Sequence, residues 1–334
     1  MSSFTFTLFL VLYSLILLVN SNGIEEFRIL LQKFNKKSIT ETPVFYKKYQ
    51  NYKTNLEFQR FLNGTHKLLS AYYGPTKFSD LSHEEFKDQY LSDLKVPRKT
   101  KDKSQQHTPS KFFRELDIPK RVDWRNFSNL NFVTPVKNQK KCGGCWAFSA
   151  TETIESMKAI QTGLPPPTLS VQEVIDCATY NDGCSGGDPY RAVKWLKDTQ
   201  SPLTTEKKYP LTDTSDSCRI IVNNSDGVIV QSCNSQRLVG REDKIVQLLN
   251  ISPVSVAVDA TTWNNYLGGI IQYHCETQIN HAVQIVGYDI SGDVPYYIVR
   301  NSWGTDYGNK GYLYIKIGEN LCGIAEEVTT VTVQ

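Results

Sequence analysis

The sequence predicts an α+β protein in which a helical half precedes a β-rich half. Residues 145–160 place their apolar side chains on one helical stripe, and residues 170–177 and 188–198 are also helix-like. From residue 254 onward the pattern changes to the alternation that is typical of strands. All eight cysteines lie between residues 142 and 322, which indicates that the first 141 residues form a separately organised part.

The amino-terminal stretch has the features of a secretion signal. Residues 4–19 are almost wholly apolar and uncharged, and sixteen residues are few for a membrane span. Val19 and Ser21 are small enough for a cleavage site, although the amino terminus is the only basic group ahead of this stretch. We therefore expect a signal peptide over residues 1–21, entry into the secretory pathway and no membrane span in the mature form. A signal anchor is the alternative.

Residues 22–117 predict helical structure followed by a linker. Aromatic and apolar residues recur at helical spacing from Phe45 to Leu62, whereas residues 95–111 are polar, basic and open to proteolysis. Residues 22–117 hold 18 Lys and Arg against 12 Asp and Glu, and residues 118–334 hold 19 against 22. These modest charges do not indicate nucleic-acid binding, but a basic segment could cover an acidic one.

The carboxyl-terminal half has the pattern of strands. Apolar or alternating runs occupy residues 254–258, 282–288, 296–300, 312–317 and 328–333. Together with the helices they belong to a stretch of 217 residues from Ile118 to Gln334. That length suffices for one large core or for two apposed cores.

Sequons and cysteines both fit an oxidising, secreted setting. The sequons begin at Asn63, Asn126, Asn223 and Asn250, and Asn250 is the weakest because Pro253 follows its serine. Eight cysteines behind a signal peptide indicate a disulfide-bonded domain. If one of them stays a catalytic thiol, seven remain, so a second cysteine must also be unpaired.

The segment Gln139–Phe148 is the strongest functional signal. It places Cys145 where a loop turns into the apolar helix, with Cys142 three residues earlier. A helix N-terminus and a neighbouring imidazolium can lower the pKa of a thiol by several units and so produce a thiolate. We therefore predict that Cys145 is the nucleophile of a hydrolase.

The base must come from the two histidines of residues 118–334. His274 adjoins Cys275 in a polar loop, whereas His281 opens an apolar strand that would hold its ring still. We therefore predict that His281 is the base.

Two amides complete the predicted site. Asn301 can accept a hydrogen bond from the other ring nitrogen of His281 and fix its tautomer. The side-chain amide of Gln139 and the backbone N–H of Cys145 can form an oxyanion hole.

The segment around Cys145 resembles the C-G-[SA]-C-[WY] signature of the papain family of cysteine proteases, with Gly144 as a departure. His281 follows Cys145 by 136 residues, and Asn301 follows His281 by 20. Further similar runs are Ile118–Arg125, Val133–Gln139 and Gly183–Gly187. The resemblance implies a helical left domain and an antiparallel β-barrel right domain with the active-site cleft between them. It also implies a cysteine-type endopeptidase without cofactor or metal.

The amino-terminal region is similar, more loosely, to the inhibitory propeptide of that family. The spacing of its helix is matched by Lys48, Tyr52, Asn55 and Asn63, with Val44 and Gln59 as departures. Gly74–Asp80 is similar to its second motif, with Thr76 in place of asparagine. The resemblance implies an inhibitory propeptide over residues 22–117 and a mature peptidase over residues 118–334. Protein and peptide substrates, cystatin-type inhibitors and a lysosomal or extracellular destination are also implied.

The resemblance further implies a disulfide pattern. The expected pairs are Cys142–Cys184, Cys177–Cys218 and Cys275–Cys322, with Cys145 catalytic and Cys233 unpaired.

A substrate cleft is implied as well. The backbones of Gly186 and Gly187 are expected to hold extended substrate, and Trp303 is expected to shield the His281–Asn301 contact and border the primed side. In the S2 pocket we expect Glu327 at the floor, Asp188 at the rim and Ala257 on the wall. Such a pocket would accept arginine as well as bulky apolar P2 side chains.

Three other functions compete with this interpretation. Cys142 and Cys145 form a C-x-x-C pair that could serve a thiol–disulfide oxidoreductase, but that function leaves Gln139, His281 and Asn301 unexplained. A structural zinc site lacks a second pair of ligands at suitable spacing. A catalytically weak binding relative is expected to lack the thiol, the base or the amide, and all three are present.

Overall fold

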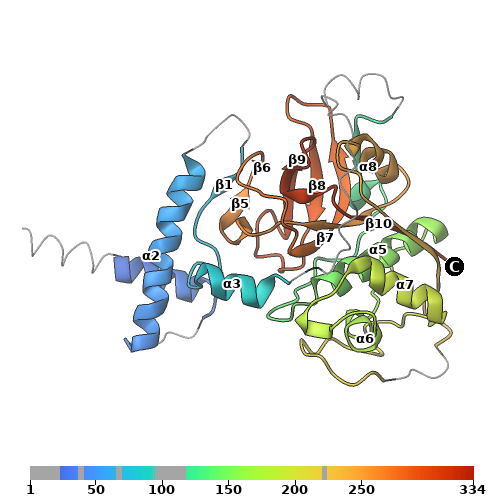
Figure 1. Cartoon of the computed structure of the whole chain (residues 1–334), viewed down its shortest axis with the longest axis horizontal. Coiled ribbons are helices and arrows are strands. Elements are labelled where there is room, and N and C mark those ends of the chain that lie inside the picture. Colours follow the sequence, from blue (N-terminus) through green and yellow to red (C-terminus); the bar gives the residue numbers. More distant parts are fainter. Residues whose placement is uncertain (1–22, 37–40, 65–69, 93, 95–117, 220–223) are drawn as a thin grey trace, which may run out of the picture.

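The computed structural model describes residues 23–36, 41–64, 70–92, 94, 118–219 and 224–334. They form a helical amino-terminal region, a helical domain and a β-rich domain (Figure 1). The predicted signal peptide, the predicted linker and Asn223 lie outside the described residues. No helix in the described ranges combines the length and apolar character that a membrane crossing requires.

The amino-terminal region has a small core of its own. Residues 23–33 are helical and pack on α2 (Pro43–Asn63) through Phe27, Phe45 and Tyr52. The Thr42 hydroxyl caps the first turn of α2. A capping box between Ser82 and Glu85 starts α3 (His83–Tyr90). Both helices lie beside the β-rich domain (Figure 1).

The helical domain surrounds α5 (Cys145–Thr162), which ends at Gly163 in a left-handed conformation. Two further helices pack near it, α6 (Val171–Cys177) and α7 (Pro189–Thr199). Their shared core includes Trp146, Phe148, Val174 and Leu196. The bounds of all three helices agree with the sequence prediction to within two residues.

The β-rich domain is built on one eight-stranded sheet. Its strand order is β3–β10–β4–β7–β8–β9–β6, and β2 pairs with β7. The strands are β2 (Arg121–Asp123), β3 (Val230–Gln236), β4 (Val254–Val258), β6 (Ile270–Ile271), β7 (His281–Asp289), β8 (Tyr296–Arg300), β9 (Tyr312–Lys316) and β10 (Val328–Val333). The pairings are antiparallel except at one edge, where the two-residue strand β6 pairs with β9 in parallel.

Several elements were not predicted from the sequence, including the short strands β2 and β6, an edge strand and a short helix. Strand β3 lies at the edge of the sheet, and most of its side chains are exposed or half-buried, so its sequence carries few apolar residues. The amphipathic helix α8 (Glu242–Leu249) is only eight residues long. A two-stranded sheet of β1 (Tyr72–Tyr73) and β5 (Tyr266–Gly268) joins the amino-terminal region to the β-rich domain.

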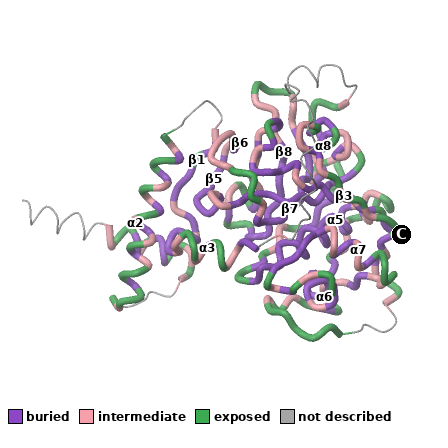
Figure 2. Tube along the Cα trace, in the orientation of Figure 1, coloured by how far each residue is buried: buried purple, intermediate pink, exposed green. Residues whose placement is uncertain are grey.

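The two domains meet along α5 and β7, both of which are buried over most of their length (Figure 2). Separate apolar cores lie on the two sides of this junction, as the length of the chain allowed. Three disulfides have the pairs that the resemblance implied: Cys142–Cys184, Cys177–Cys218 and Cys275–Cys322. Cys145 and Cys233 are free thiols.

Candidate active site

Cys145 is the first residue of α5 and is fully buried. Gly144 precedes it as the N-cap and contributes no side-chain hydrogen bond, so the N-terminal dipole of an 18-residue helix faces the thiol without a competing cap. Cys142, three residues earlier, is bonded to Cys184. This disulfide removes the dithiol that an oxidoreductase at Cys142 and Cys145 would need.

His281 is the first residue of β7, where it pairs with Val258 of β4. Its Nε2 lies 2.8 Å from Oδ1 of Asn301, an amide oxygen that can only accept, so Nε2 carries the proton. The ring of Trp303 covers the contact, with its centroid 4.8 Å from that of His281. The other nitrogen, Nδ1, is buried and has no hydrogen-bond partner among the described residues.

The amino-terminal region reaches the thiol at Ser92, whose Oγ lies 3.4 Å from Sγ of Cys145. Ser92 also donates its backbone N–H to the carbonyl oxygen of Asn280, at 2.8 Å. Ala282, which follows His281, donates a hydrogen bond from its backbone N–H to the Cys145 thiol. The two neighbours of His281 in the chain therefore both contact this part of the site: Asn280 binds Ser92, and Ala282 binds Cys145.

Burial determines the charge state of Cys145 and His281 in the covered site. Burial raises the pKa of the Cys145 thiol, and the Ser92 hydroxyl and the Ala282 N–H oppose that shift. Burial also lowers the pKa of His281 to about 4, although its hydrogen bond to Asn301 works the other way. Both shifts favour a neutral thiol beside a neutral imidazole, because Ser92 and its neighbours keep water from the site. In the covered site, burial thus opposes the lowering of the thiol pKa that the helix N-terminus and an imidazolium would cause.

Both the oxygen and the nitrogen of the Gln139 side-chain amide form hydrogen bonds. Its Oε1 accepts from the Ser302 hydroxyl at 2.6 Å, and its Nε2 donates to the carbonyl oxygen of Cys142 at 3.1 Å. The same Nε2 lies 3.2 Å from the carbonyl oxygen of Tyr90, which belongs to the amino-terminal region. The donor predicted for an oxyanion therefore contacts a peptide carbonyl of the chain's own first part.

Comparison with known proteins decides the family. A model of the papain family of cysteine proteases matches residues 118–332, and a model of the cathepsin propeptide inhibitor domain matches residues 27–86. The chain belongs to the papain family. It is a papain-like cysteine endopeptidase that carries its own inhibitory propeptide.

Individual relatives agree with this assignment. Cathepsin O of Mus musculus is 43% identical over 284 residues, which cover 84% of this chain and 88% of the relative. Cathepsin O of Homo sapiens is 39% identical over 296 residues, with 84% and 87% covered. The runs Leu169–Cys177 and Tyr266–Cys275 had suggested a likeness to cathepsin O within the family, and these relatives confirm it.

Two solved precursors have the same fold. The recombinant stem bromelain precursor superimposes with a TM-score of 0.78 at 28% identity, covering 93% of this chain and 99% of the other. Procathepsin L2 from the larval midgut of Tenebrio molitor gives a TM-score of 0.78 at 27% identity, with the same coverage.

The residues expected in the substrate cleft lie in several elements. Gly186 follows the short helix η2 (Gly183–Ser185), and a Cβ on Gly187 would lie 2.8 Å from the Trp146 ring, so close packing requires a glycine there. Ala257 lies in β4, and its N–H donates to the carbonyl oxygen of Glu327 at 3.1 Å.

The two carboxyl groups expected in S2 are both deeply buried. Asp188 also caps α7, by accepting from the N–H groups of Tyr190 and Arg191. Burial and the neighbouring Asp188 carboxylate raise the pKa of Glu327 to about 9. Glu327 is therefore neutral in this form of the papain-like chain at physiological pH.

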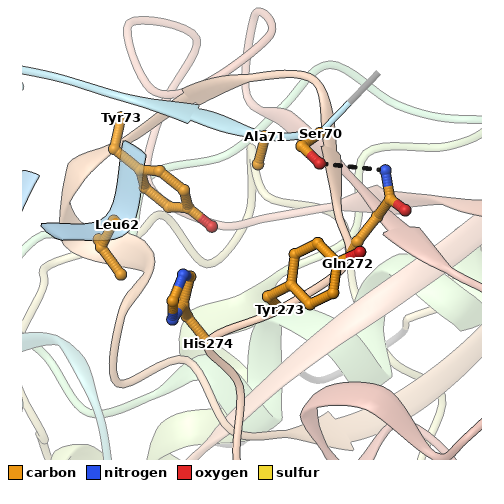
Figure 3. A pocket seen from close by; sticks show the side chains of 7 residues that line it. All are labelled: Leu62, Ser70, Ala71, Tyr73, Gln272, Tyr273 and His274. Atoms are coloured by element: carbon orange, nitrogen blue, oxygen red, sulfur yellow. Dashed lines mark hydrogen bonds between the residues drawn. The ribbon is translucent and has the colours of Figure 1, made fainter. Parts of the chain in front are cut away.

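His274, the alternative base, lies elsewhere. It lines a small pocket together with Leu62 and Tyr73 of the propeptide region (Figure 3). Its ring centroid is 5.4 Å from that of Phe61. Within the described residues no cluster of histidine, cysteine and carboxylate side chains could hold a metal ion.

Sequence analysis missed Tyr90, Ser92 and Ser302 as site residues. Ser302 could have been suspected because it adjoins Asn301. No local pattern marks Tyr90 or Ser92, whose partners Gln139 and Cys145 lie about fifty residues away.

Proposed function

We propose that residues 1–21 are a signal peptide, that residues 22–117 are removed on activation, and that residues 118–334 are the mature endopeptidase. In this scheme Cys145 attacks the scissile carbonyl carbon, and His281 first accepts the thiol proton at Nδ1. The supporting observation is the fixed, buried imidazole, whose Nε2 is bound by Asn301 while Nδ1 has no partner among the described residues.

The chemistry balances in two steps. A C–S bond forms between Cys145 and the carbonyl carbon, the C–N bond breaks, and the imidazolium of His281 gives its proton to the leaving amine. Water then attacks the thioester carbonyl carbon, the C–S bond breaks, and the carboxylic acid product and the free thiol of Cys145 are released. Gln139 Nε2 and the Cys145 N–H stabilise the oxyanion in both steps, with the substrate carbonyl in place of Tyr90.

Activation restores the ion pair in this scheme. Once Tyr90 and Ser92 leave, water and substrate reach Cys145, and the burial that raises its pKa ends. Thiolate and imidazolium can then form together under the dipole of α5.

Labelling with an epoxide inhibitor of papain-like enzymes tests these roles. The thiolate opens the epoxide by forming a C–S bond, and the released alkoxide takes up a proton. We expect the activated chain to be labelled at Cys145, as peptide mapping would show, and the Cys145→Ala variant to lose both label and activity. An active, labelled Cys145→Ala chain would refute the proposal.

The Asn301→Ala variant tests the orienting amide. We expect the variant to retain the Cys145 thiol, but its kcat should fall roughly tenfold to a hundredfold because the His281 ring is no longer held in one tautomer. Wild-type kcat in a folded Asn301→Ala chain would remove Asn301 from the mechanism.

For specificity we propose that S2 accepts arginine as well as bulky apolar P2 side chains. A guanidinium beside Glu327 and Asp188 would favour ionised carboxylates, and the small side chain of Ala257 leaves room on the wall. Dipeptide substrates with Arg or Phe at P2 measure this preference. If Glu327→Ala leaves the ratio of their kcat/KM values unchanged, Glu327 does not contribute to selectivity for the P2 side chain.

We also propose cystatin-type inhibitors as partners and a lysosomal or extracellular location.

The sequons differ in their exposure. Among the described sequons, Asn126 is exposed. The Asn63 amide bonds to the backbone of Tyr73, and the Asn250 amide nitrogen donates to Val246 and Tyr288. We therefore expect glycan on Asn126 ahead of Asn63 and Asn250, which mass mapping after glycosidase treatment would measure.

A further inference from the structure

The three elements that carry Cys145, His281 and Asn301 also meet in a second, buried polar cluster. Helix α5 contributes Glu152, about two turns below Cys145. Strand β7 contributes Gln284, three residues after His281, and strand β8 ends in Arg300, which adjoins Asn301. Glu152 is 1% exposed, and Gln284 and Arg300 are fully buried.

Gln284 joins the elements through its amide. Its Nε2 donates to the carbonyl oxygen of Glu152 at 3.0 Å and to Oγ of Ser156 at 3.1 Å. Its Oε1 accepts from Nη1 of Arg300 at 3.3 Å. One side chain on β7 thus binds both α5 and β8.

Arg300 makes the remaining links. Its Nη2 lies 3.2 Å from a carboxylate oxygen of Glu152 and donates to Oγ1 of Thr134 and the carbonyl oxygen of Pro135, at 3.0 and 2.6 Å. The guanidinium therefore touches α5, β7 and the segment before α5, while its backbone leads directly into Asn301.

We propose that Glu152, Gln284 and Arg300 are positioning residues that fix the Cys145 thiol relative to the His281–Asn301 pair. The inference rests on the catalytic roles proposed above. Hydrogen bonds from a planar guanidinium fix both distance and direction, so they define one register of α5 against the sheet. A misplacement of about 1 Å between reacting groups can change a rate by roughly a hundredfold.

A buried ion pair adds little net stability over apolar side chains of the same size, so a gain in stability does not account for this cluster.

The charge of the cluster also depends on pH. Burial raises the pKa of Glu152 to about 7, although Arg300 and Lys137 oppose the shift. The other groups that act on the pair are Glu155 on the same helix and Tyr312 of β9. Acidification below neutrality therefore protonates Glu152 and changes the charge of the cluster.

The double variant Glu152→Met/Arg300→Met separates positioning from stability. It leaves no unpaired buried charge, so we expect the full-length chain to fold with a similar Tm. After activation we expect kcat to fall roughly tenfold to a hundredfold with KM little changed. The pH profile for alkylation of Cys145 by iodoacetamide should shift as well, because the thiol–imidazole separation sets that profile.

Two single variants sharpen the test. Glu152→Gln should remove from the alkylation profile an ionisation near neutrality that wild type shows. Glu173→Gln is the matched control: Glu173 is also a buried glutamate of the helical domain, but its carboxylate binds the N–H of Thr204 and no element of the site. We expect that control to change Tm and to leave the alkylation profile intact.

Wild-type kcat and an unshifted profile in the folded double variant would overturn the positioning role. If the double variant does not fold, Arg300→Lys decides by the same two readouts, because lysine keeps the charge and loses the fork. Failure of the proposed function looks different, since the activated wild-type chain would then cleave no peptide and Cys145 would be alkylated with the pH profile of an ordinary thiol.

Discussion

The propeptide contacts the enzyme in two regions that differ in chemistry. In the first, which we term the anchor, Phe78 and Phe86 are buried against Trp303, with ring centroids 5.3 and 5.4 Å from it. In the second, which we term the cover, the carbonyl oxygen of Tyr90 contacts Gln139 and the hydroxyl of Ser92 contacts Cys145. The ring of Tyr90 itself packs with the anchor. Burial of aromatic surface stabilises a complex strongly, whereas polar contacts largely replace hydrogen bonds to water.

The difference assigns two tasks to two segments. The anchor supplies most of the free energy that holds the propeptide, and the cover excludes substrate from the thiol at little additional gain. Trp303 links the anchor to the site, because its ring packs on Phe78 and also lies against the ring of His281. Four changes to the full-length chain test this division.

The largest effect is expected from breaking the anchor. Replacing one buried phenylalanine by alanine costs about 3–5 kcal/mol, so Phe78→Ala should raise the fraction of open precursor by roughly a hundredfold to a few thousandfold. The rate of epoxide labelling of Cys145 at pH 7 measures that fraction. Phe61→Ala is the matched control, since the Phe61 ring is 63% exposed, and it should change the labelling rate much less. Equal rates for the two variants would place the binding energy elsewhere.

An ion-pair cluster next to the anchor should give the second largest effect. Asp80 is 1% exposed and pairs with Lys36 and Lys48. Although burial alone would raise the pKa of Asp80, the two lysines lower it below its ordinary value. A lowered folded-state pKa stabilises the chain above the unfolded value of about 3.9 and loses that contribution only as pH falls below it.

The Asp80→Asn variant should therefore open the precursor at every pH above about 4, by roughly tenfold or more, and should abolish a labelling increase that wild type shows below that pH. Labelling rates between pH 3 and 8 measure both features. A wild-type transition at pH 5 to 6 that survives in Asp80→Asn would belong to another group.

A polar contact at the edge of the anchor is expected to matter less. Gln59 is buried, and its Nε2 donates to Oδ1 of Asn265 at 2.8 Å. The Gln59→Leu variant leaves that amide oxygen without its donor, which costs about 1–3 kcal/mol and should speed labelling roughly tenfold. Combining it with Asn265→Leu should recover part of the loss; additive effects would show that the two side chains do not interact.

Gln59 also shows where sequence analysis stops. Gln59 departs from the propeptide pattern, and its hydrogen-bond partner in the structure is Asn265, which lies 206 residues further along the chain. By contrast, the bounds of β8 and β10 follow directly from local alternation, and Cys145 and His281 follow from a local motif and the scarcity of histidine. What a short segment determines was predictable, whereas long-range pairs such as Ser92 with Cys145 needed the fold.

The smallest effect is expected in the cover. Ser92→Ala removes one hydroxyl contact to the thiol and keeps the backbone bond to Asn280, so the precursor should open no more than about fivefold. Because the Ser92 hydroxyl lowers the pKa of Cys145, its loss should raise that pKa further in the closed precursor. The ultraviolet absorbance of the thiolate, followed against pH in the unprocessed chain, measures this shift, with Ser92→Thr as the control that keeps a hydroxyl. If Ser92→Ala opened the chain as far as Phe78→Ala does, the cover would bind as strongly as the anchor and the division of tasks would fail.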